Sequence, residues 1–193
     1  MKLLFASHNS NKVKELKQIF PTTYSLMGLD ELNDFVEIEE TGANLVENAL
    51  LKARTINKKY GYNTLSDDTG LEIEALNGAP GVLSARFAGE ENNSIRNMEK
   101  VLALMQNSDN RRAQFKTVVA LILDNKEYLF EGIVKGSILR SSRGEGGFGY
   151  DPIFLPDGYN QTFAEMSPTL KNGISHRGMA IKNLLYFLNS HHQ

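Results

Sequence analysis

The pattern of apolar residues changes partway along the chain, and this change constrains the fold more than any other feature. Early on, a short apolar run at 2–6 is followed by segments of helical spacing at 11–20 and 45–59. Residues 114–123 and 127–134 are instead two extended runs joined by a short polar turn, which predicts a β-hairpin. Because alternating strands and helices favour parallel pairing and a hairpin is antiparallel, we expect an α/β protein with a mixed sheet flanked by helices.

The remaining segments fit the same architecture. The apolar spacing after Ser94 predicts a third helix, and residues 176–188 a final one. Residues 64–66 predict a short strand that we expect to resume at 71–75, beyond a bulge at Gly70. Two further elements are a glycine-rich loop at 141–149 and a short strand at 153–155.

Composition limits the functional classes. A chain of 193 residues with 41% hydrophobic residues is long enough to bury one core, so we expect a single domain over residues 1–193. A net charge of -2 argues against binding long nucleic acid, and the apolar runs are too short to span a membrane. The chain has no Cys, which excludes disulfides and thiolate metal sites and favours a reducing cytoplasm.

Two acidic pairs stand at the edges of predicted elements. Asp67-Asp68 ends the apolar run at 64–66, and Glu39-Glu40 precedes the helix at 45–59. Mg²⁺ is held by one or two carboxylates together with waters and substrate phosphates, so convergence of these segments would suffice for a metal site. The alternative for Glu39-Glu40 is an ordinary solvated surface.

Two familiar motifs fail their context. Asp68-Thr69-Gly70 spells the triplet of aspartic proteases, but those enzymes are all-β and need two copies of the triplet. The chain has one copy, so a protease would require a dimer in which each subunit contributes one Asp. Residues 144–149 match G-x-G-x-x-G, yet they neither follow the first strand nor open a helix, so a Rossmann nucleotide site is rejected.

A phosphate site is predicted where the first strand meets the first helix. Ser7 and Asn9 lie in that turn, and Lys12 adds a positive charge beside the helix N-terminus. The alternative is that Ser7 and Asn9 only cap the helix while Lys12 is solvated.

A second set of residues suits a nucleobase. Phe148 could stack on a base while Asp151 meets its edge, and the alternative is a hairpin with Phe148 in the core. Lys171, His176 and Arg177 lie around the start of the last helix, where Arg177 offers a planar fork of donors or has a structural role.

Six spaced blocks, taken together, closely resemble the inosine triphosphate pyrophosphatase family over nearly the whole chain. In order they are Ser7-x-Asn9-x-x-Lys12, Glu40-Thr41-Gly42 with Glu47-Asn48-Ala49, Ser66-Asp67-Asp68-Thr69-Gly70-Leu71, Gly78-Ala79-Pro80-Gly81 with Ser84-Ala85-Arg86, Gly147-Phe148-Gly149-Tyr150-Asp151-Pro152, and Ser175-His176-Arg177.

This resemblance implies an elongated, two-lobed α/β domain with an active-site cleft between the lobes and assembly as a homodimer. It also implies Mg²⁺-dependent hydrolysis of non-standard purine nucleoside triphosphates (ITP, dITP and XTP) to the monophosphate and pyrophosphate, an activity that cleanses the nucleotide pool.

The resemblance also assigns roles by position. It makes Asp68 the catalytic base and a metal ligand, with Glu39 the other metal-linked acid and Glu40 the neighbour to test next. The phosphate-binding positions are Ser7, His8, Asn9, Ser10, Asn11, Lys12 and Thr69; Lys171 is a further substrate contact; and the base pocket is Phe148, Gly149, Tyr150, Asp151, His176 and Arg177. His8 departs from the family's usual glycine, and its imidazole could crowd or contact a phosphate.

Two rival functions stay open at this point. One is a nucleotide-binding module without turnover, against which the presence of Asp68, Glu39 and Lys12 speaks. The other is a pyrophosphatase for pyrimidine nucleotides.

Overall fold

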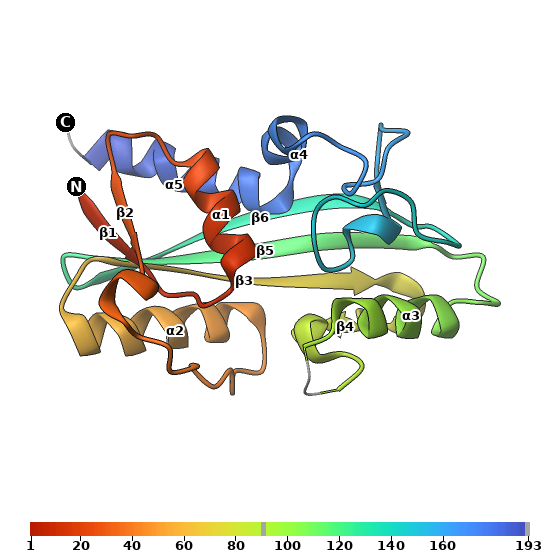
Figure 1. Cartoon of the computed structure of the whole chain (residues 1–193), viewed down its shortest axis with the longest axis horizontal. Helices are drawn as coiled ribbons and strands as arrows, with labels where there is room; N and C mark the ends of the chain where they lie inside the picture. Colours follow the sequence, from red (N-terminus) through yellow and green to blue (C-terminus); the bar gives the residue numbers. More distant parts are fainter. Residues whose placement is uncertain (90–91, 192–193) are drawn as a thin grey trace. The chain divides into compact units, whose positions relative to one another are not determined.

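The computed structural model of the chain describes residues 1–89 and 92–191, and within them the strands form one seven-stranded sheet (Figure 1). The strands are β1 (Lys2–Phe5), β2 (Ser25–Gly28), β3 (Thr64–Ile73), β4 (Pro80–Gly81), β5 (Arg112–Leu123), β6 (Lys126–Ile138) and β7 (Phe154–Pro156). The helices are α1 (Ser10–Ile19), α2 (Leu45–Tyr60), α3 (Ser94–Leu104), α4 (Pro168–Ile174) and α5 (His176–His191).

The sheet mixes parallel and antiparallel pairs, which confirms the predicted α/β class. Its order is β2-β1-β3-β5-β6-β7, with β4 paired to β3 off this path. β1 runs parallel to β2 and β3, whereas β4 is antiparallel to β3 and β7 to β6. The predicted hairpin is β5 and β6, whose turn residues Asp124 and Asn125 both have positive φ. Asn and Asp tolerate that left-handed conformation better than other residues with a side chain.

The chain divides into two compact units that are each assembled from separate segments. Unit 1 comprises Met1–Asp68, Thr117–Gly132 and the chain from Arg177 on, and unit 2 comprises Thr69–Lys116 and Ile133–His176. The strands β3, β5 and β6 therefore contribute residues to both units.

The core of unit 1 has two sides because successive strand residues point to opposite faces of a sheet. Leu3 and Phe5 of β1 pack in a cluster with α1 and α5, whereas Leu4 and Ala6 pack in a second cluster with Ile56 of α2. Figure 1 shows α1 and α5 on one side of β1 and β3 and α2 on the other.

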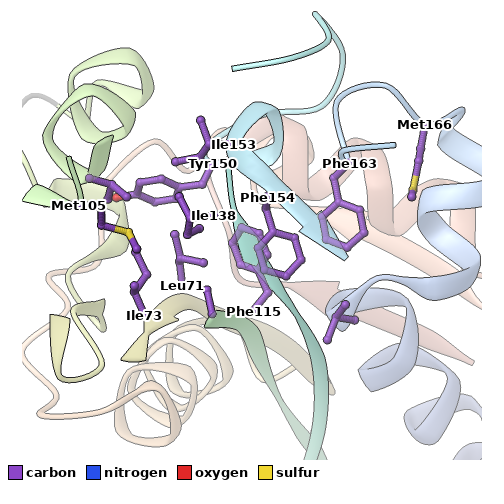
Figure 2. Packing of buried hydrophobic residues seen from close by; sticks show 13 residues of the cluster. Leu71, Ile73, Met105, Phe115, Ile138, Tyr150, Ile153, Phe154, Phe163 and Met166 are labelled. Carbon is purple, nitrogen blue, oxygen red and sulfur yellow. The ribbon is translucent and has the colours of Figure 1, made fainter. Parts of the chain in front are cut away.

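The core of unit 2 is built around aromatic rings. Phe115 of β5 lies 4.7 Å from Phe154 of β7, centroid to centroid, and Phe163 lies 5.3 Å from Phe154 (Figure 2). The strand residues Leu71 and Ile73 and the α3 residue Val101 belong to the same buried cluster.

Three features of the elements differ from the predictions or were missed. β3 runs through 64–73 without the expected interruption, and at Gly70 it passes close to β4: a Cβ there would lie 2.6 Å from the Gly81 carbonyl oxygen. Lys171 lies in a further helix, α4, which was not predicted and which begins at Pro168 after the capping residue Ser167. The short strand β2 was missed because its four residues show no alternating pattern.

No helix in the described part of the chain is long and apolar enough to cross a membrane.

Candidate active site

Asp67 and Asp68 are consecutive residues of β3 in unit 1, and they meet different partners. Their exposed fractions are only 1% and 5%. Since neighbouring strand residues point to opposite faces, Asp67 faces α1 and α5 while Asp68 faces α2. The two carboxylates therefore have separate environments although they are adjacent in sequence.

Asp67 is the centre of a buried network of charges. Its Oδ1 lies 3.2 Å from the Lys12 amine and its Oδ2 accepts a hydrogen bond of 3.1 Å from Arg177 Nε. Arg177 is 2% exposed and also donates from Nη1 to Glu15 of α1. Two cations and two carboxylates thus balance in a dry environment, as buried charges require.

The charges of this network set the pKa values of its members. Burial alone would raise the pKa of Asp67, but Lys12, Arg177 and Lys52 outweigh it and hold the pKa well below its ordinary value. For Lys12 burial is the stronger influence and lowers the pKa despite the nearby Asp67. Asp67 is therefore ionised at neutral pH and bound to cations on both oxygens.

Asp68 has one oxygen held and the other open. Lys52 of α2 donates to Asp68 Oδ1 at 3.1 Å and to Glu40 Oε1 at 2.5 Å. Asp68 Oδ2 is buried and has no hydrogen-bond partner among residues 1–89 and 92–191. Burial raises the pKa of Asp68, and Lys52 and Lys12 oppose that rise only in part. A buried carboxylate oxygen without a partner is costly unless a ligand satisfies it.

This arrangement fits a magnesium ion that is completed by the substrate. The described residues contain no group of three or more His, Cys, Asp or Glu able to hold a metal by themselves. Mg²⁺ does not require such a cage, since it keeps several waters and is bound through one or two carboxylates plus phosphates. Asp68 and a glutamate of 39–40 would supply those carboxylates.

Of the two glutamates, it is Glu40 that reaches the Asp68 group. Its carboxylate is bound to Lys52. Burial lowers the pKa of Lys52, but the charges of Asp68 and Glu40 outweigh burial, so the pKa of Lys52 is raised. Glu39 is exposed. The metal role of Glu39 stays a prediction.

The turn after β1 has the form expected for a helix start. The Asn9 side chain caps α1 by accepting from the backbone N–H groups of Asn11 and Lys12 at 3.1 and 3.2 Å. Asn9 itself donates from its backbone to Ser7 Oγ at 3.3 Å. Ser10 and Asn11 are exposed first residues of α1, a position where the helix dipole favours an anion. The predicted phosphate-binding segment is thus an exposed helix N-terminus that Asn9 caps.

In unit 2, three predicted residues from different segments come together. Asp151 Oδ2 accepts hydrogen bonds from Lys171 Nζ at 2.6 Å and from the Phe148 backbone N–H at 2.8 Å. The Lys171 amine also lies 4.8 Å from the centroid of the Phe148 ring. The ring is half-buried and lies outside the buried aromatic cluster, so the core alternative for Phe148 is not supported. Gly149 is half-buried beside it with a φ of 64°.

Three other predicted base-pocket side chains are buried. Tyr150 is 4% exposed and packs in the core of unit 2 (Figure 2). Its hydroxyl donates to the Ser84 carbonyl at 2.8 Å. His176 is 4% exposed and stacks on Phe115 at 4.5 Å. Arg177 belongs to the Asp67 network of unit 1. Contacts of these three side chains with a base stay predictions, as does a phosphate contact of Thr69, the half-buried first residue of unit 2.

Sequence reasoning missed Lys52, Asn48 and Glu15. A usable signal existed for two of them, because Asn48 and Lys52 share the buried stripe of α2 with Ala49, Ala53 and Ile56. A polar residue on the apolar face of a helix needs a partner or a ligand. Asn48 Oδ1 accepts from the Gly42 N–H at 2.7 Å, whereas its Nδ2 is buried and has no hydrogen-bond partner within the described ranges.

Known proteins resemble this chain over nearly its whole length. The chain is 48% identical to a dITP/XTP pyrophosphatase of Flavobacterium johnsoniae over 97% of its own length and 98% of that protein. It is 50% identical to a dITP/XTP pyrophosphatase of Christiangramia forsetii, with 97% and 99% of the two chains covered. The solved Ham1 protein of Staphylococcus aureus superposes with a TM-score of 0.89 at 41% identity, covering 99% of this chain and 100% of that one.

The model of one family matches almost the whole chain. It is described as the Ham1 family and covers residues 3–187. The match spans both acidic pairs, the turn after β1 and the residues around Phe148, and it confirms the relationship that the six sequence blocks indicated. The chain belongs to the Ham1 family.

Proposed function

We propose that this protein hydrolyses non-standard purine nucleoside triphosphates, namely ITP, dITP and XTP, to the monophosphate and pyrophosphate. The names of the relatives support this substrate class and the class of hydrolase. The observation that carries the proposal is the Asp68 carboxylate, which has one oxygen fixed by Lys52 and the other buried without a hydrogen-bond partner in the part of the chain described.

Asp68 is suited to accept a proton from water. Its raised pKa, due to burial, makes the carboxylate a stronger base than an exposed aspartate. As the water oxygen bonds to the α-phosphorus, the bond to the pyrophosphate leaving group breaks and its electron pair leaves with that group. The water proton passes to Asp68 Oδ2, and Lys52 on the other oxygen fixes the carboxylate orientation.

The charges of the triphosphate require cations around this base. Lys12 and the exposed N-terminus of α1 would bind phosphate oxygens. Further donors would come from Ser7, Ser10 and Asn11. Bound Mg²⁺, which we propose as the cofactor, would neutralise developing charge on the phosphates. The protein ligands would be Asp68 and one of Glu39 and Glu40.

The group around Phe148 would recognise the base. The half-buried ring offers a stacking surface, and Lys171, held by Asp151, offers a donor beside it. A donor aimed at the 6-oxo group of hypoxanthine or xanthine rejects adenine, because its amino group would leave that donor unpaired. Assembly as a homodimer and residence in the cytoplasm are part of the same proposal.

The decisive experiment measures pyrophosphate release from ITP, dITP, XTP, GTP, ATP and dUTP with and without Mg²⁺. We expect release from the first three only, and only with the metal. Binding of ITP without release would establish a nucleotide-binding module instead, and faster release from dUTP would establish a pyrimidine enzyme. Asp68→Asn should lower kcat by at least about a hundredfold, the lower end of the range for a general base.

A matched pair of variants assigns the second acid. Glu39→Gln and Glu40→Gln make the same chemical change at adjacent positions, but only Glu40 contacts Lys52. We expect Glu40→Gln to raise the Mg²⁺ concentration needed for half-maximal rate more than Glu39→Gln does. The reverse order would assign the metal to Glu39, as the sequence resemblance implied.

A further inference from the structure

His8 lies in the proposed phosphate loop between Ser7 and Asn9, and the structure gives its side chain a specific partner. The imidazole Nε2 lies 3.0 Å from the backbone carbonyl oxygen of Asp34, 26 residues further along the chain. A carbonyl oxygen can only accept, so Nε2 must carry the hydrogen. That nitrogen is therefore occupied by the protein and is not available to a phosphate.

The residue that receives this hydrogen bond is itself firmly held. Asp34 is 4% exposed, and its Oδ2 accepts from Lys59 Nζ at 2.8 Å and from the Tyr60 hydroxyl at 2.9 Å, both at the end of α2. Its backbone N–H donates to the Leu29 carbonyl at 3.0 Å, and its Oδ1 accepts from the Val36 N–H at 3.2 Å. Asp34 is thus a fixed point to which the turn after β1 can be tied.

Both ends of this connection lead to the candidate active site. His8 stands between Ser7 and the capping residue Asn9, so its position affects the turn that opens α1. Asp34 begins the segment that carries Glu40, which is bound through Lys52 to Asp68. The backbone at His8 is not left-handed, so a side chain fits there without strain.

We propose that His8 is a positioning residue that ties the phosphate loop to Asp34 and thereby holds the loop in its substrate-binding form. It acts through the loop and makes no direct contact with phosphate. The inference rests on the proposed function for its effect on substrate affinity, but the tether itself is a property of the protein without ligand. A glycine at this position would leave the loop without this connection.

Hydrogen exchange in the ligand-free protein tests the tether directly. In His8→Ala we expect the amide of Val36, which bonds to Asp34, to exchange about fivefold faster, the effect of losing one hydrogen bond. His8→Gln, which keeps a donor at similar reach, should restore slow exchange. His191→Ala, which removes another exposed imidazole on α5, serves as the control and should change nothing there. Unchanged exchange in His8→Ala would overturn the tether.

Kinetics then test the positioning role. His8→Ala should raise KM for ITP about fivefold with kcat within twofold, and His8→Gln should recover most of the affinity. Faster exchange with unchanged KM would overturn the positioning role, and loss of affinity with unchanged exchange would assign His8 to phosphate contact. If the wild-type protein releases no pyrophosphate from any substrate, the proposed function fails while the exchange comparison still decides the tether.

Discussion

At the residue scale, Asp67 and Asp68 are neighbours on one strand, yet Asp67 has a structural role and Asp68 the proposed chemical role. Asp67 meets two cations and has a lowered pKa, whereas Asp68 meets one cation, has a raised pKa and keeps an unsatisfied oxygen in the described structure. The alternation of a strand places them on different faces. Their chemistry thus follows from which helices cover each face.

The two aspartates should differ in how much stability the same substitution removes. Asp67→Asn leaves the buried Lys12 and Arg177 without a full countercharge, so we expect a loss of roughly 3–5 kcal/mol in the free energy of unfolding. Asp68→Asn should cost less than about 1 kcal/mol, because Lys52 keeps Glu40 and the buried charge was already disfavoured. Urea denaturation followed by circular dichroism measures both. Equal losses would contradict the separation of roles.

Phe148 provides a second test at this scale. Because the ring is half-buried and outside the aromatic core, Phe148→Ala should leave the protein folded and raise KM for ITP more than it lowers kcat. Phe163→Ala is the matched control, since Phe163 is fully buried and its truncation should cost roughly 3–5 kcal/mol of stability. If Phe148→Ala also unfolds the protein, the ring has a core role after all.

The residues that sequence could predict are those whose chemistry is visible locally. Residue type and neighbouring residues are enough to predict the Asn9 cap, the acidic pair on β3 and the role of Phe148 beside a glycine-rich loop. The ion pairs of Arg177 could not be predicted in this way, because its carboxylate partners Glu15 and Asp67 lie 162 and 110 residues away along the chain. Only the fold reveals that its donors are used by the protein.

At the element scale, α2 joins the site to the rest of unit 1. Its first turn is capped by Asn44, its middle carries Asn48 and Lys52 inward, and its last turn holds Asp34 through Lys59 and Tyr60. The long amphipathic helix was predicted almost to its end residues because period and cap agree. The importance of Asn48 and Lys52 on its buried face was not predicted, because polar residues only interrupt the apolar stripe that periodicity detects.

The Asp34 contacts with α2 predict a particular pH dependence. The hydrogen bond from Lys59 outweighs burial and, together with Tyr60 and the Val36 N–H, lowers the pKa of Asp34 from 3.8 to about 2. A lowered folded-state pKa stabilises the protein above the unfolded-state pKa, and this stabilisation is lost as pH falls through the folded-state value. Asp34→Asn should therefore be less stable than wild type at pH 7, and the difference should shrink between about pH 4 and pH 2.

The size of this effect is limited by solvent, since the Lys59 side chain is 48% exposed. We expect a difference on the order of 1 kcal/mol at pH 7, measured by urea denaturation at several pH values. Glu127→Gln breaks the exposed pair of Glu127 with Arg54 and is the control, with a change below about 0.5 kcal/mol. A difference between Asp34→Asn and wild type that does not vary from pH 7 to pH 2 would contradict the assigned pKa.

At the scale of the whole molecule, the two units have separate cores but share strands. β3, β5 and β6 pass from one unit into the other, so neither unit is a continuous piece of chain that could fold as an independent segment. The sequence indicated a mixed sheet because the hairpin and the early alternation are local patterns. Two lobes were expected only from the family resemblance, and the segments that make up each unit could not be predicted because they depend on pairing between residues far apart in the chain.

Shared strands predict that the units unfold together. Phe154 is fully buried in unit 2 between Phe115 and Phe163, so Phe154→Ala should cost roughly 3–5 kcal/mol. Unfolding of unit 2 alone would leave its halves of β3, β5 and β6 without their core while the other halves stayed paired. We therefore expect hydrogen exchange at increasing urea to show one midpoint for amides of both units, including Leu4 of β1 and Ala6 just after it, shifted equally by the substitution. If β1 keeps its wild-type midpoint while unit 2 opens earlier, the units are separate cooperative blocks and strand continuity does not couple them.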